Sequence, residues 1–257
     1  MRDAVAHGEE RMRAIEALIP DVWRQLDQMR AMRGQDGLQW PDWCLLPMGA
    51  CATLAQQHPR ALQQRPTNLV AEMAALYAWR HTRSVYLMEH HLTQRLLDQV
   101  PDAVGIAELT GLPEWCIYLT GAHPEYPGGG LWAHLEHDVA TGRPELRLMI
   151  DIDMDYLQAF PVYLDRESTT EALSDFRATE LATQQTQPHP DVRGSTPDRS
   201  AARLAEDVDG YIGILTYLAR TEADIVHAER PGTRPVKPRK AKRDTDTWLV
   251  GYSNAPS

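Results

Sequence analysis

A chain of 257 residues, with hydrophobic residues at 43% and charged residues at 24%, has an ordinary globular composition and can bury a sizeable core. The formal net charge of −10 argues against nonspecific nucleic-acid binding by the body of the protein. Three cysteines without CxxC spacing predict neither a disulfide framework nor a zinc site. The charged N-terminus lacks a signal-peptide core and no apolar run approaches ~18 residues, so we expect a soluble, cytoplasmic protein.

Residues 1–100 are predicted to form the helical part of a single domain spanning residues 1–257. Apolar residues recur at helical spacing from Arg2 to Met32, with a break expected at Pro20. A long helix is predicted from Asn68 to about Val100. Its buried face is expected to carry residues at spacings of four and three, namely Tyr77, His81, Val85, Met88, Leu92 and Leu96.

Residues 112–165 are predicted to form a mainly antiparallel sheet, with a hairpin turn centred on Thr141-Gly142. Period-two alternation divides the hairpin into two faces. The aliphatic face comprises Leu131, Ala133, Leu135, Val139, Leu146, Leu148, Ile150 and Ile152. The polar face comprises Trp132, His134, Glu136, Asp138, Glu145, Arg147, Met149 and Asp151. We expect the aliphatic face to be core and the polar face to be solvated or functional. Residues 160–164 are predicted to form an edge strand, because Pro161 has no backbone N–H to donate to a neighbouring strand.

Residues 168–229 are predicted to contain a helix over 168–183, an exposed loop over 184–199 and a long helix from Pro197 to Pro231. Residues 230–246 are expected to be a flexible basic segment, and 247–252 a last strand that closes the sheet edge. The predicted fold class is α+β, with N-terminal helices packed on one face of a mainly antiparallel sheet, a long C-terminal helix and a final strand.

One candidate for chemistry is a metal site on the polar face. His134, Glu136 and Asp138, with Asp151 across the hairpin, share that face, and imidazole and carboxylate groups can hold a divalent metal in a nuclease or other hydrolase. The alternative is a solvated face in which Glu136 pairs with Arg147. Exposed sheet faces commonly alternate in this way, so we favour the alternative and predict no catalytic residue, metal or cofactor.

The strongest charge feature is segment 230–243, which carries seven Lys/Arg and no acid. The remainder holds 19 basic against 36 acidic residues, a formal charge of −17. Nucleic-acid phosphates, a ribosome or an acidic partner could contact Arg234, Lys237, Arg239, Lys240, Lys242 and Arg243. The equal alternative is a solvated linker held against the acidic body, since no interleaved aromatic residues are present to stack bases.

Five stretches together resemble a known family: 74–80 (AALYAWR), 112–118 (LPEWCIY), the hairpin 133–148, 210–218 (GYIGILTYL) and 247–251 (TWLVG). They are similar to the anti-CRISPR family directed at the type V-A effector nuclease, whose relatives are carried by plasmids and phages. The resemblance implies a protein that blocks production of the effector instead of inhibiting the finished nuclease. It further implies recognition of the N-terminal part of the effector as it leaves the ribosome, with loss of the messenger.

The leading hypothesis is therefore a non-enzymatic inhibitor that captures a segment of polypeptide, such as the N-terminus of a type V-A effector as it is synthesised. The expected groove combines the sheet face with the preceding strand and loop 126–130, and an extended peptide could bind there by backbone pairing and side-chain pockets. Its predicted peptide-binding residues are Trp115, Tyr118, Trp132, His134, Glu136 and Arg147. Because this groove would be acidic, a Lys/Arg-bearing peptide is expected. The ribosome or mRNA is the expected partner of the basic segment.

Overall fold

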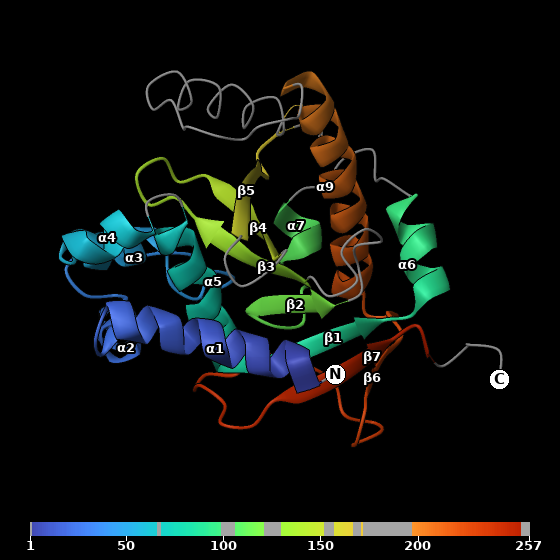
Figure 1. The fold of residues 1–257 in the computed structure, drawn as a ribbon. Helices are drawn as coiled ribbons and strands as arrows, with labels where there is room; N and C mark the ends of the chain where they lie inside the picture. Colours follow the sequence, from blue (N-terminus) through green and yellow to red (C-terminus); the bar gives the residue numbers. More distant parts are fainter. Residues whose placement is uncertain are drawn as a thin grey trace.

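The computed structural model describes residues 2–65, 68–98, 106–120, 130–151, 157–166, 171 and 197–252 (Figure 1). Its helices are α1 (Arg2–Leu18), α2 (Val22–Ala31), α3 (Met48–Gln56), α4 (Pro59–Gln64), α5 (Leu69–Thr82), α6 (His90–Leu97), α7 (Ile106–Leu109) and α9 (Pro197–Ala219). Its strands are β1 (Ser84–Met88), β2 (Cys116–Thr120), β3 (Gly130–His137), β4 (Pro144–Asp151), β5 (Leu157–Tyr163), β6 (Ile225–His227) and β7 (Asp246–Val250). Within these ranges, no helix is both long and apolar enough to cross a bilayer.

The strands form one mixed seven-stranded sheet in the order β5-β4-β3-β2-β1-β7-β6. Strand β1 pairs in parallel with β2 and β7, and the remaining pairings are antiparallel, in agreement with a mainly antiparallel sheet. Strand β5, which contains Pro161, lies at one edge as predicted. The prediction that the last strand closes an edge is wrong, because β7 lies between β1 and β6.

Helices cover both faces of the sheet, so the prediction of a single covered face is wrong. One apolar cluster joins residues of α6, α7 and α9 to one face, and a second joins α1, α2, α3 and α5 to the other. Figure 1 shows the N-terminal helices and α9 on different sides of the strands. The sheet therefore forms the middle layer of three.

The long helix predicted over residues 68–100 is wrong, because three elements share that stretch. Helix α5 ends where Arg83 adopts a left-handed conformation with φ 47°, and β1 follows at once. Helix α6 then starts after Glu89, whose carboxylate accepts hydrogen bonds from the backbone N–H groups of His91 and Leu92. Val85 and Met88 fit a helical period, but they belong to a strand. The spacing of apolar residues alone did not distinguish this strand from a continuation of the helix.

The C-terminal helix ends earlier than its predicted limit near Pro231. Helix α9 ends at Ala219, and Ile225 and its neighbours form the edge strand β6. The turn between them is closed by the Tyr217 hydroxyl, which accepts a 2.8 Å hydrogen bond from the Asp224 backbone. Apart from Glu171, the predicted helix over 168–183 lies outside the described residues, as does most of the loop over 184–199.

The hairpin of β3 and β4 has the predicted division into faces. Its register pairs Leu131 with Ile150 and Leu135 with Leu146, and these aliphatic side chains lie in the cluster that includes α9. Val139 is the exception, because it lies in the turn and is 58% exposed. Ile152 is outside the described residues.

Candidate functional site

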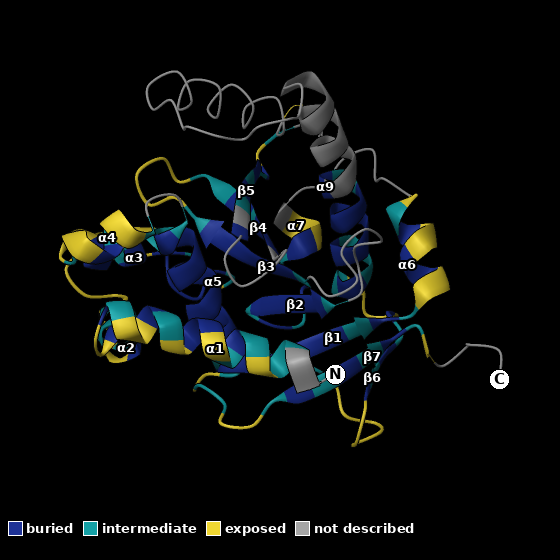
Figure 2. Ribbon diagram, viewed as in Figure 1, coloured by how far each residue is buried: buried dark blue, intermediate teal, exposed yellow. Residues whose placement is uncertain are grey.

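The polar face of the hairpin lies beneath helices. Trp132 is 1% exposed, His134 2% and Glu136 3%. All three residues come from β3, which Figure 2 colours mostly as buried. Trp132 packs in the cluster that contains α1, α3 and α5, and Glu136 contacts the start of α3. The prediction of a solvated face is therefore wrong. Alternation along a strand separates two faces, but it does not determine what covers either of them.

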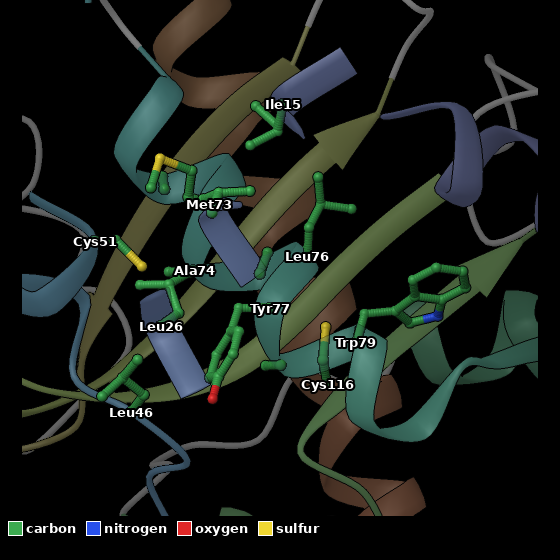
Figure 3. Packing of buried hydrophobic residues seen from close by; sticks show 14 of the residues in the cluster. Ile15, Leu26, Leu46, Cys51, Met73, Ala74, Leu76, Tyr77, Trp79 and Cys116 are labelled. Carbon is green, nitrogen blue, oxygen red and sulfur yellow. The ribbon is translucent and has the colours of Figure 1, made fainter. Parts of the chain in front are cut away.

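An aromatic cluster joins this face to the helices. The Trp132 ring stacks on Tyr118 with centroids 3.8 Å apart and meets Trp79 of α5 edge-on at 5.1 Å. Figure 3 shows Trp79 with other α5 side chains among the packed residues. Helix α1 passes close to both indoles, because a Cβ atom added at Gly8 would lie 2.7 Å from Trp79 and 3.0 Å from Trp132. The cluster is therefore packed core.

The buried charges on this face hold helix α3. His134 Nε2 lies 2.9 Å from Glu136 Oε1, and Glu136 Oε2 accepts a 2.9 Å hydrogen bond from the backbone N–H of Met48. Met48 is the first residue of α3, whose N-cap residue, Pro47, offers no side-chain cap. The Glu136 carboxylate therefore supplies the missing acceptor and places negative charge at the positive end of the helix.

Strand β4 adds a second buried charge pair. Glu145 lies opposite Glu136 in the register and forms an ion pair with Arg147. Burial, together with the charge of Glu136, raises the pKa of Glu145 to about 7, although Arg147 acts in the opposite direction. Burial and the same Glu136 charge raise the pKa values of Cys44 and Cys51, so these thiols stay protonated and unreactive. The predicted pairing of Glu136 with Arg147 is wrong, because Arg147 pairs with Glu145.

Of the four candidate metal ligands, the structure brings His134 and Glu136 together but not Asp138, and the side chain of Asp151 is outside the described part. Asp138 is exposed in the hairpin turn, where its carboxylate accepts hydrogen bonds from the Ala140 backbone at 2.9 Å and the Thr141 hydroxyl at 2.6 Å. Both carboxylate oxygens of Glu136 are already engaged, one by His134 and the other by the backbone N–H of Met48 in α3. The described part of the chain contains no group of three His, Cys, Asp or Glu side chains placed to hold a metal ion.

The six residues predicted to bind a peptide fall into two groups. Trp115 and Arg147 are half-buried. The other four are buried, namely Tyr118, Trp132, His134 and Glu136. Direct contact between a peptide and these four would require the covering helices to move. Of loop 126–130, only Gly130 is among the described residues. A peptide-binding role for the six residues stays a prediction.

Residues 230–243, which we call the basic strap, lie against the body of the protein. The Trp115 indole N–H donates a 2.9 Å hydrogen bond to Pro238 O, and the Lys237 ammonium lies 5.4 Å from the centre of the same indole ring. Lys237 also donates to Thr110 O at 3.0 Å, and burial lowers its pKa. These contacts favour the alternative in which the segment is held against its own protein.

The remaining cations of the strap divide into paired and unpaired groups. Lys242 and Arg230 form ion pairs with Asp246. Burial alone would raise the pKa of the Asp246 carboxyl, but the hydrogen bonds and positive charges around it have the larger combined effect and lower that pKa. Arg234 donates to Ala223 O at 3.1 Å. Among the described residues, the side chains of three exposed cations form neither a hydrogen bond nor an ion pair: Arg239, Lys240 and Arg243.

A buried polar cluster beside the strap was missed in the sequence. Glu114, directly before Trp115, accepts a 2.8 Å hydrogen bond from the Ser84 hydroxyl, which accepts one at 3.2 Å from Trp248. Burial raises the pKa of Glu114 to about 8. The available signal was a single acid within an apolar stretch, but Ser84 could not be paired with it while residues 68–100 were assigned to one helix.

Comparison with known proteins identifies the family. The profile of the family described as "AcrVA2-like: Anti-CRISPR type V subtype A2 family" matches residues 86–257. The fold is similar to a solved structure described as the crystal structure of AcrVA2, with a TM-score of 0.67, 17% sequence identity, and coverage of 96% of this chain and 85% of that chain. A search of curated proteins found no match. The profile match covers well over half of the sequence, and the chain belongs to the AcrVA2-like anti-CRISPR type V subtype A2 family.

Proposed function

We propose that the protein is a non-enzymatic inhibitor, encoded by a mobile element, that suppresses production of a type V-A CRISPR effector nuclease in the cytoplasm. In this proposal it binds a segment near the N-terminus of the effector polypeptide during synthesis. The observation that carries the proposal is the family match over residues 86–257, which supports an inhibitor role. The polypeptide target and the loss of messenger follow from the family resemblance.

The arrangement of charged residues also supports a binding protein over a hydrolase. The His134–Glu136 pair is enclosed and hydrogen-bonded to the first turn of α3, so it has no open position for a substrate. Asp138, the exposed member of the candidate metal set, is engaged in its own turn. The described residues therefore offer binding surfaces more readily than a reaction centre.

The experiment separates suppressed production from inhibition of the finished enzyme. The effector and this protein are expressed together in bacteria from separate promoters, and effector protein and messenger are quantified. In parallel, purified effector loaded with guide RNA is assayed for DNA cleavage with and without this protein. We expect effector protein and messenger to fall several-fold in cells, whereas cleavage by the purified nuclease stays unchanged.

Two recoded effectors test whether the polypeptide is recognised. Synonymous changes in the first codons alter the messenger and preserve the peptide, so suppression should persist. Amino-acid substitutions over the same codons should allow production to recover. Suppression that instead follows the nucleotide sequence would refute polypeptide recognition, and inhibition of the purified nuclease alone would refute a block in production.

A further inference from the structure

We propose that the basic strap and the adjoining end of α2 form a ready-made docking surface for an acidic segment of polypeptide. We call this the strap surface and define it by Met32, Val236, Arg239, Lys240 and Arg243. The inference rests on the proposed function, because it assigns a place and a charge to the polypeptide that the inhibitor binds.

The main chain of the strap is fastened at several points. The carbonyl groups of Pro238, Arg239 and Arg243 accept hydrogen bonds from side chains of the body, and one strap amide donates to the body. These bonds are Trp115 Nε1 to Pro238 O at 2.9 Å, Arg30 to Arg239 O at 3.2 Å, Arg83 to Arg243 O at 2.7 Å, and Lys242 N to His81 O at 3.2 Å. A fastened segment loses little conformational entropy when it binds, so its charges are available at low cost.

The fastening leaves charge facing outward. Arg239, Lys240 and Arg243 are exposed, and no hydrogen bond or ion pair occupies their side chains within the described part of the chain. Asp244 follows them and offsets one charge. At one anchor point, burial and the charges of Arg30 and Arg80 lower the pKa of His81 to about 4, although Asp27 acts in the opposite direction. The strap surface is thus locally basic on a chain of net charge −10.

Apolar and aromatic groups decide between a polypeptide and a nucleic acid. Met32, at the end of α2, is 41% exposed, and Val236 of the strap is 57% exposed, so both segments offer apolar area to a peptide. Methionine and arginine are enriched at protein interfaces. The Trp115 ring, in contrast, already contacts Lys237 and its N–H group is used, so it is not free to stack on a base. The acidic remainder of the chain would also repel a long polyanion.

The charge of the partner is opposite to that expected from the sequence. The acids of the predicted groove, Glu136 and Glu145, are buried and held by His134 and Arg147. They cannot attract a Lys/Arg-bearing peptide from solvent in this arrangement. Arginine guanidinium groups bind carboxylates through two parallel hydrogen bonds, so Arg239 and Arg243 favour Asp and Glu side chains.

The test measures peptide binding to the full chain by fluorescence anisotropy. The probes are labelled peptides that tile the N-terminal part of a type V-A effector, together with an unrelated peptide of alternating Glu and Ala. The variant is the triple substitution Arg239→Ala, Lys240→Ala and Arg243→Ala. The matched control is Arg60→Ala, Arg95→Ala and Arg220→Ala, which removes three exposed and unpaired cations from other parts of the surface.

We expect acidic tiles to bind the unaltered chain and the control alike, and to bind the strap variant at least tenfold more weakly. Binding should weaken with added salt and on replacement of the acids in the tile by Asn and Gln. Equal binding by the strap variant, or preference for a Lys/Arg-rich tile, overturns the proposal. A single-stranded poly-U probe that outcompetes the acidic peptides and is lost with the strap would replace the polypeptide by a nucleic acid.

The cell assay distinguishes failure of this inference from failure of the proposed function. If the unaltered chain suppresses effector production and the strap variant does so equally, the function stands and the strap surface is not the docking site. If acidic peptides bind at the strap but the unaltered chain leaves effector levels unchanged, the surface stands and the proposed function fails. Thermal unfolding of both variants confirms that neither result reflects misfolding.

Discussion

The two faces of the sheet differ in chemistry, yet both are buried. One face is aliphatic, with Leu131, Leu148 and Phe160 packed beneath α9 and its neighbours. The other carries Trp132, which stacks on Tyr118 and meets Trp79 edge-on, together with charged pairs beneath α1, α3 and α5. The hairpin part of the aliphatic face is packed by apolar side chains, whereas the polar face also needs each charge to find a partner. A strand face with polar and charged residues can therefore lie inside the protein and connect the sheet to the helices that cover it.

The largest effect is expected from truncation at the centre of the polar face. Trp132→Ala should lower the free energy of unfolding by about 3–5 kcal/mol, similar to Phe160→Ala on the aliphatic face, because both rings are fully buried. Urea denaturation measures the change. Val139→Ala, in the exposed hairpin turn, is the control and should change stability by less than about 0.5 kcal/mol. A loss for Trp132→Ala as small as that of the control would mean that this face is solvated.

The next prediction concerns the hydrogen bond between the Glu136 carboxylate and the start of helix α3. Glu136→Ala leaves the Met48 N–H and His134 without their partner and should cost about 1–3 kcal/mol. Hydrogen exchange should show the lost protection concentrated in α3. Glu16→Ala, which removes an exposed and unpaired acid from α1, should leave α3 unchanged. Uniform loss of protection across the sheet would contradict a local role in capping α3.

A matched pair of glycines tests the contact between α1 and the indoles. Gly8→Ala and Gly49→Ala both gain helix propensity, but only the Cβ atom at Gly8 has close neighbours. Gly8→Ala should therefore be less stable than Gly49→Ala by about 1–3 kcal/mol, because the indoles must shift. Thermal unfolding of the two variants gives the difference. Equal stability would show that α1 moves away from the sheet without cost.

The last prediction concerns the pH dependence of stability, in which the change per pH unit is small and the two faces should differ. Burial raises the pKa of Glu145 from 4.5 in the unfolded chain to about 7, so between these values the folded state binds more protons. Its contribution to stability is present at low pH and is lost as pH rises toward 7, by at most about 1.4 kcal/mol per pH unit. Glu145→Gln should make stability less dependent on pH over this window, and Leu148→Ala on the aliphatic face should not. An unchanged pH profile in Glu145→Gln contradicts this role.

The parts of the fold that depend on neighbouring residues could be predicted. The hairpin faces follow from alternation, the turn at Thr141-Gly142 is supported by Gly142 with φ 75°, and Pro161 correctly marks an edge strand. Strand β1 could not be recognised, because its apolar residues continued the period of the helix before it. The break depends on Arg83 adopting a left-handed conformation, which residues of its type rarely do.

The parts that depend on distant contacts could not be predicted. What covers the polar face is decided by Gly8 and Met48, far along the chain from the hairpin. The strap is likewise fastened by Arg30, Arg83 and Trp115, none of which lies near it in sequence. The sequence therefore indicated which residues were unusual in charge, but not which of them would be enclosed and which presented to solvent.

The interior position of β7 has a consequence for how the inhibitor is made. Strand β1 emerges early in synthesis, but one of its two neighbours is formed by residues 246–250. Until those residues leave the ribosome, β1 has an unpaired side and β6 has no strand to join. A stop codon before or within residues 246–250 would therefore remove or shorten an inner strand, and β1 gains its second neighbour only after those residues have left the ribosome.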